Sequence, residues 1–542
     1  MTTLITHARV FTADPARPWA DSFAVAGDRF AAVGTEPEVR AELDAQGNEA
    51  AEPIDLDGAL VVPGFIDGHF HTVSTGEALQ RVDLVRAKSL PEIQRLVRQH
   101  ADAHPDAAWV LGKSWLFDAV PGGRPTAAMI DAVVPDRPVL LDANDYHSAW
   151  VNTAALRELG IDAATPDPVG GRVDRDPATG EATGFLEENA AGVYAWDHLE
   201  RITDEASRLG HLRAAIDACN AAGMTGVVDM AMRDADLAAM VTAEQEGWLD
   251  LRVVGHWVMD RGGSAADHVD RVRQVAELAR RHRSDRLRIA GIKIWVDGVI
   301  DGCTAAMVEP LTTGAHPDAL WEADALNPVV AAADAAGLQV AMHAIGDRAV
   351  GLALDAVAHA QHANGSGDRR HRIEHIETVS QSDLPRFGQL GVTASVQPVH
   401  ADPAIRPNWA AMLGAERAER GFPWPELVAG GGRLVLGTDA PTAPYAPLPN
   451  LFIAATRRSA LDRGLAAAQP SYALALDDAV RAATSSAAWS VFEEGSRGRV
   501  AGGMLADFAV VHPDVFDAEP DDLLDAQVLL TVLGGRTVHR SA

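Results

Sequence analysis

The residues best suited to chemistry begin with two histidines, His69 and His71, at the end of an apolar run that starts at Leu60. Such a run predicts a buried strand, and side chains two apart on a strand face the same way. Both imidazoles could therefore bind one metal ion from the same side. A pair of hydrogen-bonded core histidines has the same local pattern, so the rest of the chain has to decide.

Two more histidines follow apolar runs further along the chain. His343 ends Val340-Ala-Met-His343, and His375 ends His371-Arg-Ile-Glu-His375. Taken singly, each is typical of a hydrogen-bonded core histidine. Their repetition at successive strand ends, after His69 and His71, favours metal binding instead.

Lys293 and Asp439 complete this set of polar residues. Lys293 lies within an apolar strand, where a bare cation would be costly. It is therefore either a neutral or salt-bridged structural residue, or a lysine carboxylated by carbon dioxide that bridges two metal ions. Asp439 follows the run Leu434-Val-Leu-Gly-Thr438, where it is either a helix cap or the general base for a metal-bound water.

A further group of residues is predicted to contact substrate. His147 could bond the substrate or its oxyanion, and the alternative is a buried loop histidine. Trp115 and Trp295 could wall an apolar pocket, although tryptophan is common in protein cores. Gln397 opens a segment, 398–421, that is predicted as a lid over the site. The remaining members of this group are Asp297 and Cys303.

Regular alternation of strand-like and helix-like segments predicts the frame that positions these residues. Together with the strand ending at His69, the predicted strands give about eight β/α units, the count of a TIM-type (β/α)8 barrel. The chemistry of such barrels lies at the carboxyl ends of the strands, where the candidate ligands occur. The other predicted strands are 225–229, 251–257, 289–296, 338–342, 372–375, 392–396 and 433–436.

Both ends of the chain carry short β segments, which predicts a small β-sandwich built from the two termini. The expected organisation is sandwich over 1–60, barrel over 61–485 with an insertion at about 72–215, and sandwich again over 486–542. The fold class is thus α/β, with a β-rich addition.

The composition excludes some classes of binding partner and indicates the cellular compartment. The 542 residues are 47% hydrophobic and carry a net charge of −30, which argues against nucleic acid and anionic membranes as partners. The two cysteines, Cys219 and Cys303, fit a reducing cytoplasm rather than a disulfide framework. With no signal-like or bilayer-spanning run, a cytoplasmic protein is expected, and a homodimer is the default assembly.

The six polar residues and the motifs around them resemble the amidohydrolase superfamily. Within it, the chain resembles the YtcJ-like branch (amidohydrolase family 3), which includes N-substituted formamide deformylase. The motifs that carry the resemblance lie at 62–71, 145–152, 184–188, 293–298, 342–347, 372–375 and 437–439.

The resemblance implies a metal-dependent hydrolase with one or two divalent ions, usually zinc. His69, His71 and Asp439 would hold the more buried ion, His343 and His375 the second, and carboxylated Lys293 would bridge them. A metal-activated hydroxide would attack the carbonyl of a small amide substrate, and Asp439 would carry the proton to the leaving nitrogen. Asp439, His343 and His375 are thus the expected catalytic residues.

Two alternatives to this amide hydrolase remain open. One is a deaminase of the same superfamily, with a single metal and no bridging lysine. The other is a regulatory or binding protein that has kept the barrel, which the complete set of six polar residues disfavours because burying them without metal is costly.

Overall fold

The computed structural model describes residues 2–47, 52–143, 148–168 and 171–541. The chain divides into two compact units. One consists of Met1–Thr72 with Ile216–Ala542, and the other is the insertion Val73–Ala215.

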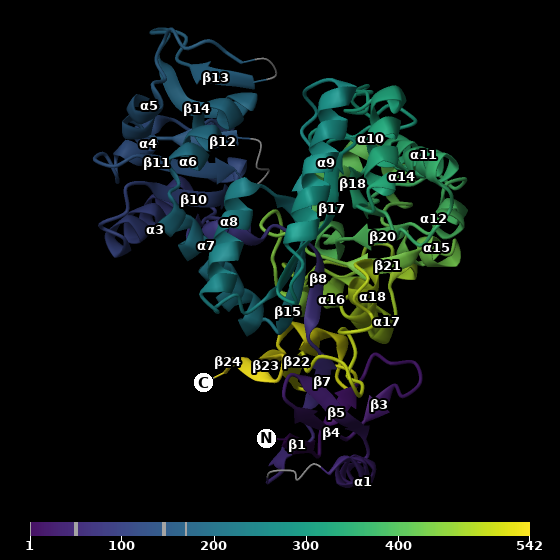
Figure 1. Ribbon diagram of the computed structural model, residues 1–542. Helices are drawn as coiled ribbons and strands as arrows, with labels where there is room; N and C mark the ends of the chain where they lie inside the picture. The colour runs from purple at the N-terminus through teal and green to yellow at the C-terminus, as the bar shows by residue number, and fades with distance from the viewer. Residues whose placement is uncertain (1, 48–51, 144–147, 169–170, 542) are drawn as a thin grey trace. The chain divides into compact units, whose positions relative to one another are not determined.

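The first unit is organised around eight parallel strands that form a nearly closed barrel (Figure 1), which confirms the predicted TIM-type fold. Each strand pairs with its neighbour in chain order. The strands are β8 (Phe65–Phe70), β15 (Met224–Met232), β16 (Arg252–Val258), β17 (Leu287–Trp295), β18 (Gln339–Ala344), β19 (Arg372–His375), β20 (Thr393–Val396) and β21 (Arg433–Leu436).

The first and last barrel strands, β8 and β21, approach each other closely at their carboxyl ends. The backbone N–H of Asp439 donates to the carbonyl of His69 at 2.8 Å, and that of His71 donates to the carbonyl of Ala440 at 3.1 Å. Glycine makes this approach possible, since a Cβ on Gly437 would lie 2.5 Å from the backbone nitrogen of His69. Barrel closure therefore brings His69, His71 and Asp439 together.

Helices follow most of the barrel strands and pack their apolar faces on the sheet. α9, for example, begins with Ser264 as its N-cap, whose hydroxyl accepts the backbone N–H of Asp267. The main helices of this layer are α8 (Asp234–Gln245), α9 (Ala265–Arg281), α10 (Ala323–Ala335), α11 (Asp347–Asn364), α12 (Leu384–Leu390), α15 (Trp424–Ala429) and α16 (Pro447–Thr456).

A β-rich domain in the same unit joins the two ends of the chain (Figure 1). Its residue limits, 1–60 and 486–542, stay predictions, and its strand β7 already lies at 60–63. One sheet contains β5 (Arg29–Gly34), β4 (Ser22–Ala26), β1 (Thr2–Thr6) and β6 (Ile54–Asp55); the other contains β24 (Arg536–Arg540), β23 (Gln527–Leu533), β22 (Phe508–His512), β7 (Leu60–Pro63), β2 (Arg9–Phe11) and β3 (Trp19–Ala20).

The core of this domain mixes residues from both termini. Phe23 from the N-terminal segment packs edge-on against Phe508, with ring centroids 5.1 Å apart. β7 pairs with β2 in parallel and with β22 in antiparallel orientation. The strand that leads into β8 is therefore held by strands from both ends of the chain.

The insertion has its own mixed sheet and its own buried core. Helices α3 (Leu90–Ala103), α4 (Ala127–Asp131) and α5 (Thr153–Leu159) accompany this sheet. Its strands, in spatial order, are β13 (Gly171–Arg175), β14 (Ala182–Glu188), β12 (Ser148–Val151), β11 (Val139–Ala143), β10 (Val110–Trp115) and β9 (Val82–Asp83).

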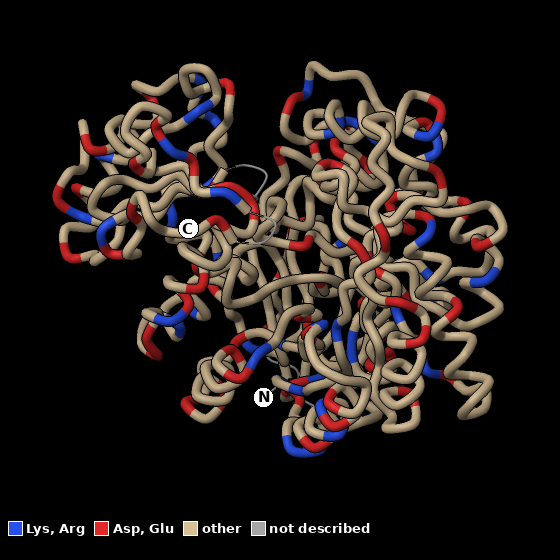
Figure 2. Tube along the Cα trace, turned by 90° about the horizontal axis from the view of Figure 1, so that it is seen from above, with Lys and Arg blue, Asp and Glu red and all other residues tan. Residues whose placement is uncertain are grey.

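Acidic residues outnumber basic ones, 76 to 46, and both kinds are interspersed along the chain (Figure 2). Among the described residues, no helix has both the length and the apolar character needed to cross a membrane.

Candidate metal centre

The six predicted ligand positions all lie at or near the carboxyl ends of barrel strands. His69 lies in β8, Lys293 in β17 and His343 in β18, while His375 is the last residue of β19. His71 directly follows β8, and Asp439 lies three residues after the end of β21. Because parallel strands place their carboxyl ends at one rim of a barrel, the fold gathers residues that are up to 370 positions apart.

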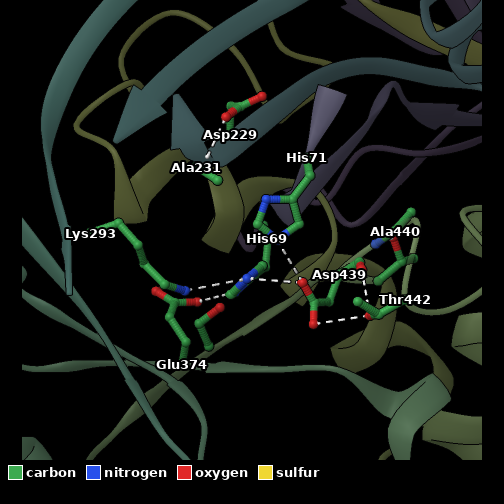
Figure 3. Close-up of polar contacts among 12 residues, drawn as sticks. His69, His71, Asp229, Ala231, Lys293, Glu374, Asp439, Ala440 and Thr442 are labelled. Atoms are coloured by element: carbon green, nitrogen blue, oxygen red, sulfur yellow. Dashed lines mark hydrogen bonds and ion pairs between the residues drawn. The ribbon is translucent and has the colours of Figure 1, made fainter. Parts of the chain in front are cut away.

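Asp439 lies within contact distance of both His69 and His71 (Figure 3). Its Oδ1 atom lies 2.9 Å from Nε2 of His71 and 3.2 Å from Nε2 of His69. The two imidazoles outweigh the cost of burial and lower the pKa of Asp439 well below its ordinary value. Asp439 is therefore an anionic ligand candidate at neutral pH.

A buried carboxylate orients the ring of His69 by contacting its Nδ1 atom. Its Nδ1 atom lies 2.8 Å from Oε2 of Glu374, and both side chains are almost fully buried. A carboxylate only accepts, so Nδ1 carries a proton, which leaves Nε2 as the ring nitrogen that can bind a metal ion. This is the usual arrangement of a metal-binding histidine, in which the second ring nitrogen donates to a carboxylate.

Glu374 is in turn held by Arg372 on the same face of β19. Nε of Arg372 donates to Oε1 of Glu374 at 2.8 Å, and the guanidinium also bonds the carbonyl of Gly68 and the hydroxyls of Ser395 and Ser490. Burial alone would raise the pKa of Glu374, but Arg372 and His69 lower it well below its ordinary value. Glu374 is thus a fixed negative charge behind His69.

His343 and His375 form the other half of the cluster, with ring centroids 4.4 Å apart. Burial lowers the pKa of His343 to about 3 and that of His375 well below its ordinary value, so both rings are neutral. Nε2 of His343 donates to the carbonyl of Gly298 at 3.1 Å, which leaves Nδ1 as its free lone pair.

The backbone is strained at two of these ligand positions. The φ angle is 77° at His375 and 58° at Asp439, in the left-handed region that non-glycine residues seldom adopt. Such strain is commonly retained where a side chain must be aimed at a functional site.

Lys293 lies on the inner side of the same cluster. Its Nζ atom is 3.4 Å from Nε2 of His69, and the side chain is almost fully buried. Burial lowers the pKa of the amine to about 8, so that a minor fraction is neutral near pH 7.

The donor set fits a divalent cation. One ligand atom each from His69, His375 and Asp439 lies within 4.8 Å of the others, and all three side chains are buried. Nδ1 of His375 is buried with no hydrogen-bond partner among the described residues. Neutral imidazoles with an anionic carboxylate are ligands of zinc and related transition metals.

Comparisons with known proteins identify the family of this chain. The model of the amidohydrolase family known as Amidohydro_3 matches residues 52–539. The chain belongs to this amidohydrolase family. Together with the ligand set, this makes the protein a metal-dependent hydrolase.

Three relatives illustrate the breadth of this amidohydrolase family. The Arabidopsis thaliana protein LONG AFTER FAR-RED 3 is 32% identical over 99% of this chain and 91% of its own length. The putative amidohydrolase YtcJ of Bacillus subtilis is 29% identical over 92% of each chain. N-substituted formamide deformylase of Arthrobacter pascens is 28% identical over 98% of this chain and 97% of its own.

Solved structures show the same fold. An uncharacterized metal-dependent hydrolase from Pyrococcus horikoshii superposes with a TM-score of 0.79 at 23% identity, over 96% of this chain and 99% of that one. A second, from Pyrococcus furiosus, has a TM-score of 0.76 at 25% identity, over 96% of this chain and all of that one.

Asp297, predicted to contact substrate, braces a loop of this amidohydrolase. Its buried carboxylate accepts the backbone N–H groups of Ala306, Ile345 and Gly346 at 2.8–3.0 Å. Burial raises the pKa of Asp297 to about 7. It lies 3.6 Å from Nε2 of His343, so it positions the segment after β18 beside the metal cluster. A direct substrate contact stays a prediction.

The other residues predicted to contact substrate lie in different surroundings. Trp295 is half-buried, with its ring 5.7 Å from Nζ of Lys293. Cys303 contacts Met412, with the two sulfurs 3.3 Å apart. Trp115 packs in the insertion's own core and donates to the carbonyl of Leu141, the core role that its type also allows. His147 lies outside the described residues.

The segment 398–421 is largely helical. It contains η4 (Pro398–Ala401), α13 (Arg406–Leu413) and α14 (Ala415–Ala418). Nε1 of Trp409 on α13 donates to Oε2 of buried Glu377 at 2.7 Å, which ties the segment to the end of β19. Movement of this segment as a lid stays a prediction.

Sequence reasoning gave no roles to Arg372, Glu374 and Glu377. A signal existed for the first two, because Arg372 and Glu374 are two apart in a buried strand and so share one face. Opposite charges on one buried face indicate an ion pair. No comparable local signal marks Glu377, since its partner Trp409 is 32 residues away.

Proposed function

We propose that this protein hydrolyses a non-peptide C–N bond in a small amide, such as an N-substituted formamide, with zinc as the metal. The observation that carries the proposal is the convergence of His69, His375 and Asp439 at the barrel rim, with Glu374 fixing the tautomer of His69. The relative named N-substituted formamide deformylase supports the choice of substrate.

The ligand roles are those that the resemblance to the amidohydrolase superfamily implies. His69, His71 and Asp439 would hold one ion, and His343 and His375 a second. A bound divalent ion would lower the pKa of water and polarise the amide carbonyl. The neutral amine of Lys293 is the form that adds carbon dioxide, losing a proton to give a carbamate that would bridge the two ions.

Asp439 is proposed to shuttle the proton. It is anionic and bonded to His71, and its Oδ2 also accepts the hydroxyl of Thr442 at 3.1 Å. It would accept a proton from the attacking water and deliver it to the departing nitrogen, which must leave as a neutral amine.

A deaminase with one metal is the second candidate. The single three-residue group His69, His375 and Asp439 found among the described residues favours one ion rather than two. In that case Lys293 would be unmodified, with a structural or substrate-binding role.

Metal content measured by plasma mass spectrometry separates these candidates. About two equivalents per chain, with hydrolysis of formamides or other amides, would support the first proposal. About one, with ammonia released from an amino-substituted ring, would support the deaminase. A protein that binds no metal after reconstitution would refute both.

Two substitutions test the residue roles. Asp439→Asn should abolish turnover while most metal remains bound, and undiminished activity would remove Asp439 as the shuttle. His69→Ala should lose metal as well as activity, and full metal content would contradict its role as a ligand.

A further inference from the structure

A second polar group lies beside the metal cluster, at the ends of β19 and β20. Its members are Glu377, which follows β19, and Gln397, which follows β20. The ring of His400 connects Glu377 to the cluster: its Nε2 is 3.7 Å from Oδ2 of Asp439, and its Nδ1 is 3.8 Å from Oε1 of Glu377. The backbone N–H of His400 also donates to the carbonyl of Gln397 at 3.0 Å. The ring of His400 also stacks on that of His375, 5.8 Å away and nearly parallel.

The strand register aims Gln397 into the mouth of the barrel. Ser395, two residues earlier, points inward, since its hydroxyl accepts Nη2 of Arg372 at 2.9 Å. The backbone of Gln397 is still extended, so its side chain faces the same way as that of Ser395, one step nearer the rim. The neighbouring N–H of Gly437 bonds the carbonyl of Val396, which places Gln397 level with the turn that carries Asp439.

Gln397 is buried without hydrogen bonds. Only 2% of its surface is exposed, yet neither Nε2 nor Oε1 has a partner among the described residues. A buried amide left in this state costs free energy, and native proteins rarely retain one without a reason. A bound ligand that completes these bonds is such a reason.

Only one of the two carboxyl oxygens of Glu377 has a hydrogen-bond partner among the described residues. One carboxylate oxygen, Oε2, accepts Nε1 of Trp409 at 2.7 Å, whereas Oε1 faces His400 beyond hydrogen-bond distance. Gln397 offers an amide oxygen, and Glu377 offers a carboxyl oxygen that keeps acceptor capacity whether or not the group carries a proton; an N–H group is the complement of such acceptors.

We propose that Gln397 and Glu377 form a subsite for the nitrogen side of the substrate, and that it selects amides bearing an N–H over esters and N,N-disubstituted amides. The inference rests on the proposed amide hydrolysis and specifies its substrate class. Gln397 and Glu377 are specificity residues, because they bind the nitrogen while the cluster acts on the carbonyl.

The test compares two ligands of nearly the same shape, N-butylformamide and butyl formate, in which oxygen replaces the N–H. Dissociation constants are measured on the metal-free protein by saturation-transfer NMR. The wild type should bind the formamide about tenfold more tightly, the usual worth of one hydrogen bond. Equal affinities, or binding of neither compound, would overturn the inference.

Two variants then locate the selection. Gln397→Leu removes both polar atoms at similar volume. In Glu377→Gln, the amide oxygen accepts from Trp409, so an NH2 group, which cannot accept, replaces the carboxyl oxygen that faces the ligand. Each variant should reduce the preference for the formamide several-fold. A preference that both variants retain would refute the assignment.

Urea unfolding of the metal-free protein supplies a readout independent of binding. Gln397→Leu should leave the urea midpoint unchanged or raise it, because the amide it removes has no partners. A clearly lowered midpoint would show that Gln397 stabilises the fold, contrary to the inference. The matched control is Gln339→Leu, since buried Gln339 donates to the carbonyls of Arg370 and Ser490 and should lower the midpoint.

Failure of this inference and failure of the proposed function are distinguishable. In the zinc-loaded protein, the compared quantity is the ratio of kcat/KM for N-butylformamide to kcat/KM for butyl formate. If both compounds are hydrolysed and this ratio is the same in wild type and in both variants, the subsite alone is refuted. A binding preference for the formamide without hydrolysis of any amide would refute the function and leave the subsite standing.

Discussion

His69 depends on two residues that bind no metal themselves. Glu374 accepts the Nδ1 proton of His69, and Arg372 holds Glu374 in place. This buried Arg–Glu–His series fixes which imidazole nitrogen faces Asp439. A charge partner of this kind raises the basicity of a ligand histidine and restrains its ring.

Replacing Glu374 with Gln should therefore weaken metal binding without abolishing it. The amide oxygen still accepts from His69, but the negative charge is lost, and such changes typically cost about 10- to 100-fold in metal affinity. Competition with a chelating dye measures the effect. Unchanged affinity would show that His69 needs no charged partner. Glu494→Gln, which alters an Arg–Glu pair away from the cluster, is the control.

Glu377 gives a pH-dependent prediction for the metal-free protein. Burial raises the pKa of Glu377 from its ordinary value of 4.5 to about 8. The folded state then holds a proton that the unfolded chain has lost, so this residue reduces stability as pH rises from about 4.5 to about 8. Glu377→Gln should thus gain stability relative to wild type across that window, as judged by urea unfolding at pH 5, 7 and 9. A difference independent of pH would contradict this.

At the level of elements, the site depends on how closely β8 approaches the end of β21. Gly68 and Gly437 are both needed there, since a Cβ on Gly68 would lie 2.8 Å from the carbonyl oxygen of Leu436. Asp67 reinforces the closure by accepting the backbone N–H of His69 and the N–H and hydroxyl of Thr438.

Gly437→Ala should push these two segments apart. The added methyl meets the backbone nitrogen and Cβ of His69 at 2.5 and 2.7 Å, so both His69 and Asp439 must shift. We expect a loss of about 1–3 kcal/mol in the free energy of unfolding, together with weaker metal binding. Calorimetry and metal titration measure the two effects. Gly495→Ala, where a Cβ meets nothing within 4 Å, is the control, and equal behaviour of both variants would refute the argument.

At the scale of the whole molecule, every candidate ligand belongs to one compact unit, and the described residues of the insertion Val73–Ala215 contribute none. Metal binding stabilises only the folded state that holds the ligands. At a free-ion concentration a thousand times the dissociation constant, the gain is about 4 kcal/mol.

Removing the metal with a chelator should therefore act unevenly along the chain. Hydrogen exchange followed by mass spectrometry should accelerate in β8, β19 and β21, while peptides from the core of the insertion keep their protection. A uniform acceleration would show that the two units unfold together.

Much of the fold was predictable because its signals are local. Strand runs and their alternation with helices depend on side chains a few residues apart, which is why the eight barrel strands were predicted at nearly their observed positions. The two-sheet domain was harder. β7 is four residues long, and only its pairing with β2 and β22 assigns it to that domain rather than to the barrel.

The sequence by itself determined the kinds of ligand and the strand ends that carry them, because residue type and strand periodicity are properties of short segments. Only the tertiary structure decided which nitrogen of His69 faces Asp439, that Trp115 lies in a core, and that Gln397 is buried without partners. These outcomes depend on contacts between residues far apart in the chain. Such contacts follow from the register of neighbouring strands and the closure of the barrel. Neither is specified by the sequence of a single short segment.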